Sequence, residues 1–318
     1  MQLNYSTQHD NYRDCRLSYM SALPQAGKSQ FTVLFACVGI IGTILNTCLF
    51  YLFARWSELR KNGGNKLFMS MTLANSLVTS VFAISKILQI QFPHHCAINL
   101  LGVFNSSLLI VSSTSITAIA IIYYSRLKKF RKYHWLTPAD EPNYVRYIVI
   151  CWLSPLFVIL PYFLSTMITI LCFLALQIAY DIIFMITYNM VVKELLEHYR
   201  RARVLDMARL DRVIVSTKFK KASELIGLLM ITSFLATLPM MLSLTSNFLL
   251  TLTKEPLKQK HTSLISAAAQ FLSVLNAAFV PLVCLYKHMD VKRFCKKTLN
   301  CNLFRRRNRV RPIVYHLP

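Results

Sequence analysis

The sequence predicts an all-α integral membrane protein, a bundle of seven transmembrane helices followed by a short amphipathic eighth helix. Hydrophobic residues make up 55% of the 318 residues and charged residues only 15%, which is too apolar for a soluble domain of this length. The apolar residues fall into long stretches with few charges, and the basic residues lie between those stretches. A spanning helix needs about 20 mainly apolar residues, and each stretch reaches that length.

Six apolar stretches account for the seven spans. Five have the length of a single span: 31–54, 67–90, 97–124, 222–246 and 262–286. The sixth runs from Val145 to Val192, with Arg146 and Asp181 as its only fully charged residues, and is about twice as long as one span. It must therefore fold back on itself.

The turn in this long stretch is predicted near two prolines and the polar residues after them. Pro155 and Pro161 disfavour helix, because proline lacks a backbone donor and restricts the residue before it. Ser165 and Thr166 follow and mark the end of the first half. The fourth and fifth spans are then joined by a short, apolar outer loop.

The distribution of Lys and Arg predicts the orientation of the chain. Of the 36 basic residues, 7 lie in the N-terminal tail and alternate loops, whereas 29 lie in 55–66, 125–146, 193–221 and 287–318. Because basic loops stay in the cytoplasm, the N-terminus is predicted outside the plasma membrane. The expected parts are an extracellular tail (1–30), a seven-transmembrane domain (31–286) and a cytoplasmic eighth helix with a basic tail (287–318).

Composition disfavours several classes of function. The net charge of +23 does not indicate nucleic acid, because the basic residues alternate with membrane spans. The nine cysteines form no Cys-x-x-Cys pair or zinc-like cluster, so neither metal nor cofactor is expected. We expect no enzyme, since no catalytic carboxylate pair or Gly-rich nucleotide loop is found. A small channel or transporter is a distant alternative, because paired intramembrane charges and pore glycines are lacking.

Two ionisable residues inside the spans are candidates for function, because a charge at the bilayer centre is costly. Asp181 lies beside Tyr180 and either hydrogen-bonds a neighbouring helix or binds a polar group of a ligand. Lys86 lies near the outer end of the second span and either snorkels to the headgroups or faces a ligand. A stripe of Ser, Thr and Asn in the second and third spans is typical of contacts between helices, and the alternative for a minority of these residues is that they line a pocket. The candidate ligand-binding residues are Asp181, Tyr180, Lys86, Asn105 and Gln270.

Two modifications are expected on the outer side. Asn4 begins an Asn-Tyr-Ser glycosylation sequence, which fits an extracellular tail. Cys96 stands at the outer start of the third span, where oxidising conditions permit a disulfide. Its expected partner is Cys172 or Cys15; the alternative for Cys172 is a free cysteine buried in the fifth span.

The segment after the last span has an amphipathic pattern. Val291 and Phe294 lie on one apolar side and the basic residues largely elsewhere, which is typical of a helix lying on an anionic inner leaflet. Cys295 and Cys301 in this segment are either palmitoylated or free thiols.

These features together resemble the G-protein-coupled receptor superfamily over nearly the whole chain. Trp152 resembles its fourth-helix tryptophan, Tyr188 its fifth-helix tyrosine and Pro239 its sixth-helix proline, while Pro281 resembles the proline of the Asn-Pro-x-x-Tyr motif. The chain departs from the rhodopsin-like pattern at residues 119–124, which read IAIIYY in place of Asp-Arg-Tyr, and in having no second-helix aspartate. These departures resemble the bitter taste receptors of type 2, with divergent rhodopsin-like odorant receptors as the alternative.

The resemblance implies a chemosensory receptor that binds a small, largely hydrophobic ligand in the outer half of the bundle. Its other partners would be the lipid bilayer and a heterotrimeric G protein. Pro239, Tyr188 and Pro281 are the expected switch positions. The positive-inside pattern accounts for most of the basic residues on the inner side, but the surface expected to contact the G protein comprises Tyr123, Tyr124, His198, Arg201, Lys220 and Lys221.

Overall fold

The computed structural model describes residues 23–61, 63–92, 96–133, 143–162, 165–204, 210–253, 259–288 and 291. Within these ranges the chain is helical and contains no strand. Seven segments are long and apolar enough to cross a membrane: Gln25–Arg55, Gly63–Gln91, Ser106–Lys129, Tyr144–Tyr162, Ile168–Glu197, Lys221–Ser246 and Thr262–Lys287. The predicted bundle of seven membrane helices is therefore confirmed. The expected eighth helix falls outside the described residues, apart from Lys287, His288 and Val291.

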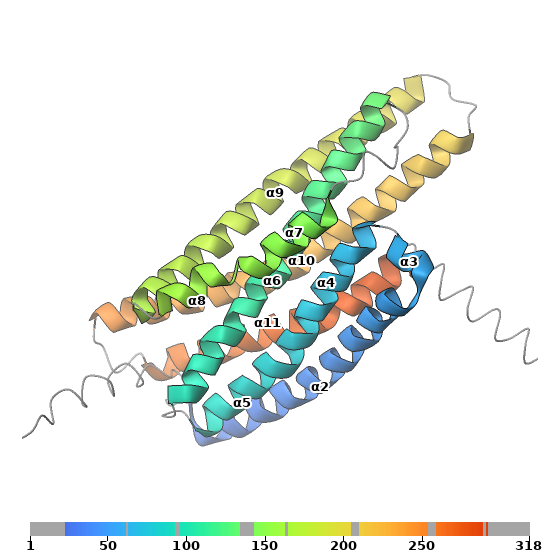
Figure 1. Cartoon of the computed structure of the whole chain (residues 1–318). Helices are drawn as coiled ribbons and strands as arrows, with labels where there is room; N and C mark the ends of the chain where they lie inside the picture. Colours follow the sequence, from blue (N-terminus) through green and yellow to red (C-terminus); the bar gives the residue numbers. More distant parts are fainter. Residues whose placement is uncertain are drawn as a thin grey trace, which may run out of the picture.

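The described part of the chain forms eleven helical elements (Figure 1), of which all but α3 contribute to the spans. Their bounds are α2 Gln25–Arg55, α3 Ser57–Lys61, α4 Gly63–Leu77, η2 Val78–Phe82, α5 Ala83–Gln91, α6 Cys96–Tyr133, α7 Tyr144–Leu153, α8 Leu156–Tyr162, α9 Thr166–Val204, α10 Leu210–Thr253 and α11 Gln259–Lys287.

The long apolar stretch folds back where the sequence predicts. Helix α8 ends at Tyr162 and α9 begins at Thr166, so the turn follows Pro161. Pro155 interrupts the span earlier, between α7 and α8, but the chain continues in the same direction. Pro161 thus lies near the turn as expected, whereas Pro155 interrupts the helix within the span and does not mark its end.

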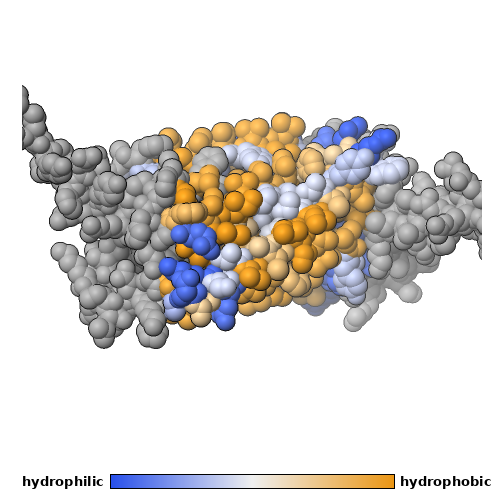
Figure 2. Space-filling view, turned by 90° about the horizontal axis from the view of Figure 1, so that it is seen from below, coloured by the Kyte–Doolittle hydropathy of each residue, from blue (hydrophilic) through white to orange (hydrophobic). Residues whose placement is uncertain are grey.

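Helix α6 lies at the centre of the bundle. It packs against α4, η2, α5, α7, α8, α9 and α10, while α11 packs against both α10 and α2. The outer faces carry large apolar side chains, and Figure 2 shows an apolar band with hydrophilic residues toward both ends. We call the end where α2, α6, α9 and α11 begin the amino-terminal end, and the end where α2 stops at Arg55 the basic end.

Small residues allow α2 to lie close to its neighbours. A Cβ on Gly42 would come within 2.6 Å of Thr79 Cγ2 and 2.8 Å of Ala278 Cβ, so only glycine fits at this contact. One turn further, Asn46 Nδ2 donates to the carbonyls of Gly42 at 2.9 Å and Ala277 at 3.0 Å. Close packing and interhelical hydrogen bonds of this kind hold helices together in lipid.

The second span contains a π-helical turn, η2, between two α-helical parts. A π-turn holds an extra residue and so rotates every later side chain by about 100° around the helix axis. Such turns are frequent at functional sites. In this span it directly precedes the segment that carries Lys86.

Candidate functional site

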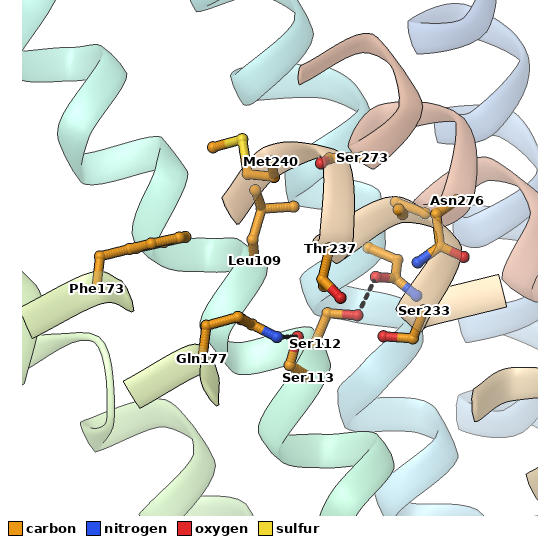
Figure 3. A pocket seen from close by; sticks show the side chains of 13 residues that line it. Leu109, Ser112, Ser113, Phe173, Gln177, Ser233, Thr237, Met240, Ser273 and Asn276 are labelled. Atoms are coloured by element: carbon orange, nitrogen blue, oxygen red, sulfur yellow. Dashed lines mark hydrogen bonds between the residues drawn. The ribbon is translucent and has the colours of Figure 1, made fainter. Parts of the chain in front are cut away.

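A cavity of about 30 Å³, lined by both polar and apolar side chains, lies in the middle of the bundle (Figure 3). Five helices contribute to its wall: α4, α6, α9, α10 and α11. The lining residues are Asn75, Leu109, Ser112, Ser113, Phe173, Gln177, Ser233, Ala236, Thr237, Met240, Ser273, Asn276 and Ala277. A cavity of this size has room for about two water molecules.

Asn75 of α4 is the fully buried polar centre of this cavity. Its Oδ1 accepts a hydrogen bond of 2.7 Å from Ser112 Oγ of α6. Neither Asn75 Nδ2 nor Asn276 Oδ1 has a hydrogen-bond partner among the described residues. Leaving a buried polar atom unpaired costs about 1–3 kcal/mol. The cavity therefore offers one free donor and one free acceptor to whatever enters it.

The α9 side of the cavity is a chain of hydrogen bonds that joins three helices. Gln177 Nε2 lies 3.3 Å from Ser113 Oγ of α6 and 3.2 Å from Asp181 Oδ1. Asp181 Oδ2 accepts from Thr237 Oγ1 of α10 at 3.4 Å. In the structure, Asp181 forms a hydrogen bond to a neighbouring helix, which is the first of its two predicted roles. The carboxylate stands behind the cavity wall and ties α9 to α10.

The cavity lies beside the proline of α10. Thr237 and Met240, which flank Pro239, both line it. A proline inside a helix removes one backbone hydrogen bond and weakens the helix at that turn. Leu109, Phe173 and Met240 line the side of the cavity toward the amino-terminal end, so much of that side is apolar.

The sequence matches no family model, and no curated protein matches it at a significant level. The structure does have a solved counterpart. The crystal structure of squid rhodopsin matches it with a TM-score of 0.68, over 88% of this chain and 87% of that chain, at 14% sequence identity. The fold is rhodopsin-like. With seven apolar helices, this likeness supports a multi-pass membrane protein; at 14% identity it shows the fold alone, and one fold hosts many functions.

The predicted ligand-binding residues do not meet in one place in this rhodopsin-like bundle. Tyr180 is half-buried and packs against the apolar cluster of Ile110, Val158, Phe173 and Met240. Gln270 donates to Ser266 Oγ at 3.4 Å, and its Oε1 has no partner in the described part of the chain. Neither Tyr180 nor Gln270 lines the cavity.

Lys86 and Asn105 complete the predicted set. Lys86 does not snorkel, because its side chain is only 5% exposed. It lies 11 residues beyond Asn75, about 16 Å further toward the amino-terminal end. The side chain of Asn105 lies outside the described ones.

The sequence does not single out the residues of this cavity. Asn75, Ser112 and Ser113 belong to the polar stripe, of which most members are expected in contacts between helices and a minority in a pocket, and these three do both. Gln177 and Thr237 carried no signal of their own, because single polar residues in apolar spans are common. Their spacing on one face of each helix was the available indication.

The predicted switch residues lie where α9, α10 and α11 pack together. A Cβ on Gly227 of α10 would stand 2.5 Å from Tyr188 Oη, so this glycine lets the tyrosine of α9 lie against α10. Pro239 and Pro281 stand inside α10 and α11. Tyr123 packs at the rim of the largest apolar cluster, toward the basic end.

The remaining residues of the predicted G-protein surface are only partly described. Tyr124 is half-buried in α6, and Lys221 is exposed in α10. His198 and Arg201 stand in α9 and Lys220 in α10, but their side chains lie outside the described ones. Asn4, Cys295 and Cys301 also lie outside the described residues.

The predicted bridge between Cys96 and Cys172 is not formed, because Cys172 is a free thiol. Gln177 contacts Ser113, which fixes the level of α9 along α6. From that contact Cys172 is five residues back along α9, about 8 Å, whereas Cys96 is 17 residues back along α6, about 26 Å. A disulfide needs Cα atoms within about 7 Å of each other, and this register prevents it.

Proposed function

We propose that the protein is a G-protein-coupled receptor of the plasma membrane with its N-terminus outside. The observation that carries the proposal is the cavity, which connects five helices of a rhodopsin-like bundle at the proline of α10. The ligand enters from the amino-terminal end, and a heterotrimeric G protein binds at the basic end.

The walls of the cavity favour a small and largely hydrophobic ligand. Leu109, Phe173 and Met240 form the side that the ligand meets first. Ligand pockets in proteins have volumes of about 300–1,000 Å³, about ten to thirty times the size of this cavity. A ligand must therefore move these side chains and the helices that carry them.

Movement of α10 is the natural response to such a ligand. Met240 and Thr237 stand on either side of Pro239, so displacing them bends α10 at its weakest turn. The ligand shifts the equilibrium between the two forms only by its difference in affinity for them. Asp181 takes part through Gln177 and Thr237, and Tyr180, Asn105 and Gln270 remain proposed ligand contacts.

At the basic end, bending of α10 opens a surface for the G protein. Tyr123, Tyr124 and Lys221 form part of that surface, together with His198, Arg201 and Lys220. The cationic residues there suit an acidic or polar partner helix, and Tyr188 and Pro281 lie between this surface and the cavity. Glycosylation at Asn4 and palmitoylation at Cys295 and Cys301 fit the same orientation.

We assign the receptor to the chemosensory type, either similar to the bitter taste receptors of type 2 or to rhodopsin-like odorant receptors. The test is expression with a promiscuous G-protein α subunit and calcium imaging with bitter compounds, odorants and amines. Responses to bitter compounds support the first class, and responses only to odorants or amines support the second. Silence of a chain shown to reach the cell surface would contradict the receptor proposal.

A matched pair of variants links any response to the cavity. Thr237→Val removes the hydroxyl that bonds Asp181, and we expect it to weaken ligand potency about tenfold, which corresponds to about 1.4 kcal/mol. Thr232→Val is the control, because this hydroxyl bonds only the carbonyl of Leu229 in its own helix. Asp181→Asn tests the same link from α9, and unchanged potency in both Asp181→Asn and Thr237→Val would refute it.

A further inference from the structure

Lys86 of α5 is a buried cation without a carboxylate partner among the described residues. Its side chain is 5% exposed in the half of the bundle toward the amino-terminal end. Nζ donates to Gln89 Oε1 at 2.9 Å and lies 4.8 Å from the centre of the Phe82 ring. An ammonium group has three N–H donors, so one hydrogen bond and one ring leave it incompletely satisfied.

Other residues hold Gln89 in place to receive this ammonium group. Gln89 Nε2 donates to the carbonyl of Ile98 in α6 at 3.4 Å, which turns Oε1 toward Lys86. The amide fits because Gly102 of α6 has no side chain, since a Cβ at that position would overlap Gln89 Nε2. Residues of α5 and α6 therefore surround the ammonium group of Lys86 and hold its hydrogen-bond acceptor in place. A lysine whose ammonium group extended to the lipid headgroups would not need this arrangement.

The described carboxylates are in the wrong places to neutralise Lys86. Glu194, Glu197 and Glu224 lie toward the basic end of the bundle, and Asp181 is held by Gln177 and Thr237. Asp10, Asp14 and Glu255 lie outside the described residues. A charge buried without a partner is strongly unfavourable, and charges inside a membrane bundle mark binding sites by default.

We propose that Lys86 binds the carboxylate of a small apolar carboxylic acid. The carboxylate takes the ammonium donors that Gln89 leaves unused, and the apolar body of the acid packs on the partly buried side chains at the edge of the surrounding apolar cluster, among them Ile87 and Leu109. Leu109 also lines the cavity of the proposed receptor. A single lysine suits one negative charge, whereas phosphate groups are usually held by several cationic donors. Lys86 thereby selects the ligand of the receptor proposed above, although the binding itself requires no G protein.

The test is the melting temperature of the purified full-length protein in detergent at pH 7.4. Three acids are compared with their alcohols: octanoate with 1-octanol, cinnamate with cinnamyl alcohol, and phenylacetate with 2-phenylethanol. At saturating concentration we expect at least one acid to raise the melting temperature by about 4 °C and its alcohol to raise it much less. Lys86→Met removes the effect of the acid, and Lys86→Arg retains part of it.

Controls separate the site from general effects of charge and folding. Lys28→Met removes a cation near the same end of the bundle and should leave the response to the acid intact. Gly102→Ala displaces Gln89 but keeps Lys86, so it should weaken the response severalfold without abolishing it. Neutralising Asp10, Asp14 and Glu255 together should not reduce the response.

Three results would overturn the proposal. They are equal stabilisation of wild type and Lys86→Met by the acids, equal effects of acid and alcohol, and no stabilisation by any of the three acids. Binding that depends on Lys86 in a protein silent in calcium imaging would support this site while contradicting the receptor function.

Discussion

Glu224 of α10 and Lys287 of α11 form an ion pair with an N–O distance of 3.1 Å near the basic end of the bundle. The two side chains are 42% and 32% exposed, so water screens the pair. Exposed pairs contribute about 0.2–1 kcal/mol. The pair is nevertheless placed where α10 must leave α11 if it bends at Pro239.

The first prediction concerns this pair. Glu224→Gln should raise ligand-independent signalling by up to about fivefold, because a contact worth at most about 1 kcal/mol that holds α10 against α11 is lost. Lys287→Gln should do the same. The exchange of both charges, Glu224→Lys with Lys287→Glu, should restore the low basal level. Calcium imaging of variants with equal surface expression measures the basal signalling. If the two substitutions in the charge-exchanged variant raise it additively instead of compensating each other, the ion pair does not hold α10 against α11.

The second prediction concerns the centre of the cavity. Ser112→Ala leaves the buried Asn75 Oδ1 without its donor, so the protein should lose about 1–3 kcal/mol of stability and melt several degrees lower. Ser106→Ala is the matched control on the same helix, because its hydroxyl bonds only the carbonyl of Gly102. Thermal unfolding in detergent measures both. Equal melting temperatures for the two variants would mean that the bond between α4 and α6 contributes nothing.

The third prediction tests the contact of Tyr188 with Gly227. Gly227→Ala places a Cβ 2.5 Å from Tyr188 Oη, so the tyrosine must move and stability should fall by about 1–3 kcal/mol. Tyr188→Phe in the same chain removes the hydroxyl and should recover part of the loss. Gly27→Ala, whose Cβ meets only Pro24 Cδ at 3.7 Å, should be neutral or slightly stabilising. A neutral Gly227→Ala would contradict the close packing of α9 on α10.

The fourth prediction follows from the free thiol of Cys172. Cys172→Ser should leave the melting temperature within about 1 °C of wild type, and reducing agents should not alter that comparison. A disulfide in its place would contribute about 2–4 kcal/mol, and its loss would be easily measured. Mass spectrometry of peptides containing Cys172, after alkylation without reduction, checks the same point directly.

Much of the fold could be predicted from the sequence, because lipid imposes a simple rule on each span. The rule requires about 20 apolar residues and no unpaired backbone groups, and it gave the spans and the fold-back after Pro161. The cavity could not be predicted in the same way. Its polar residues come one or two at a time from five helices, and which of them face one another depends on how the helices are rotated.

Lys86 shows why rotation matters. Snorkelling and burial are equally compatible with a lysine near the end of an apolar stretch. The π-turn at Val78–Phe82 adds a residue to the helix and turns the later side chains, and Lys86 becomes covered. Nothing in the apolar pattern of the span marks the extra residue. The predicted disulfide of Cys172 was wrong for a related reason, because the contact of Gln177 with Ser113 sets the level of Cys172 along α6.

The bond from Asn46 to the carbonyl of Ala277 has a consequence for biosynthesis. The two residues are 231 positions apart, and ribosomes add about 5–20 residues per second, so the donor waits about 10–50 s before its acceptor exists. During that interval α2 is in the bilayer, the side-chain amide of Asn46 lacks the carbonyl of Ala277, and the close contact of Gly42 with Ala278 is not yet made. Until the last helix arrives, α2 can be held by α3, α4, η2 and α5, but not by α11. Truncated or stalled chains therefore expose this polar surface to lipid, where the machinery that removes incomplete membrane proteins can recognise it.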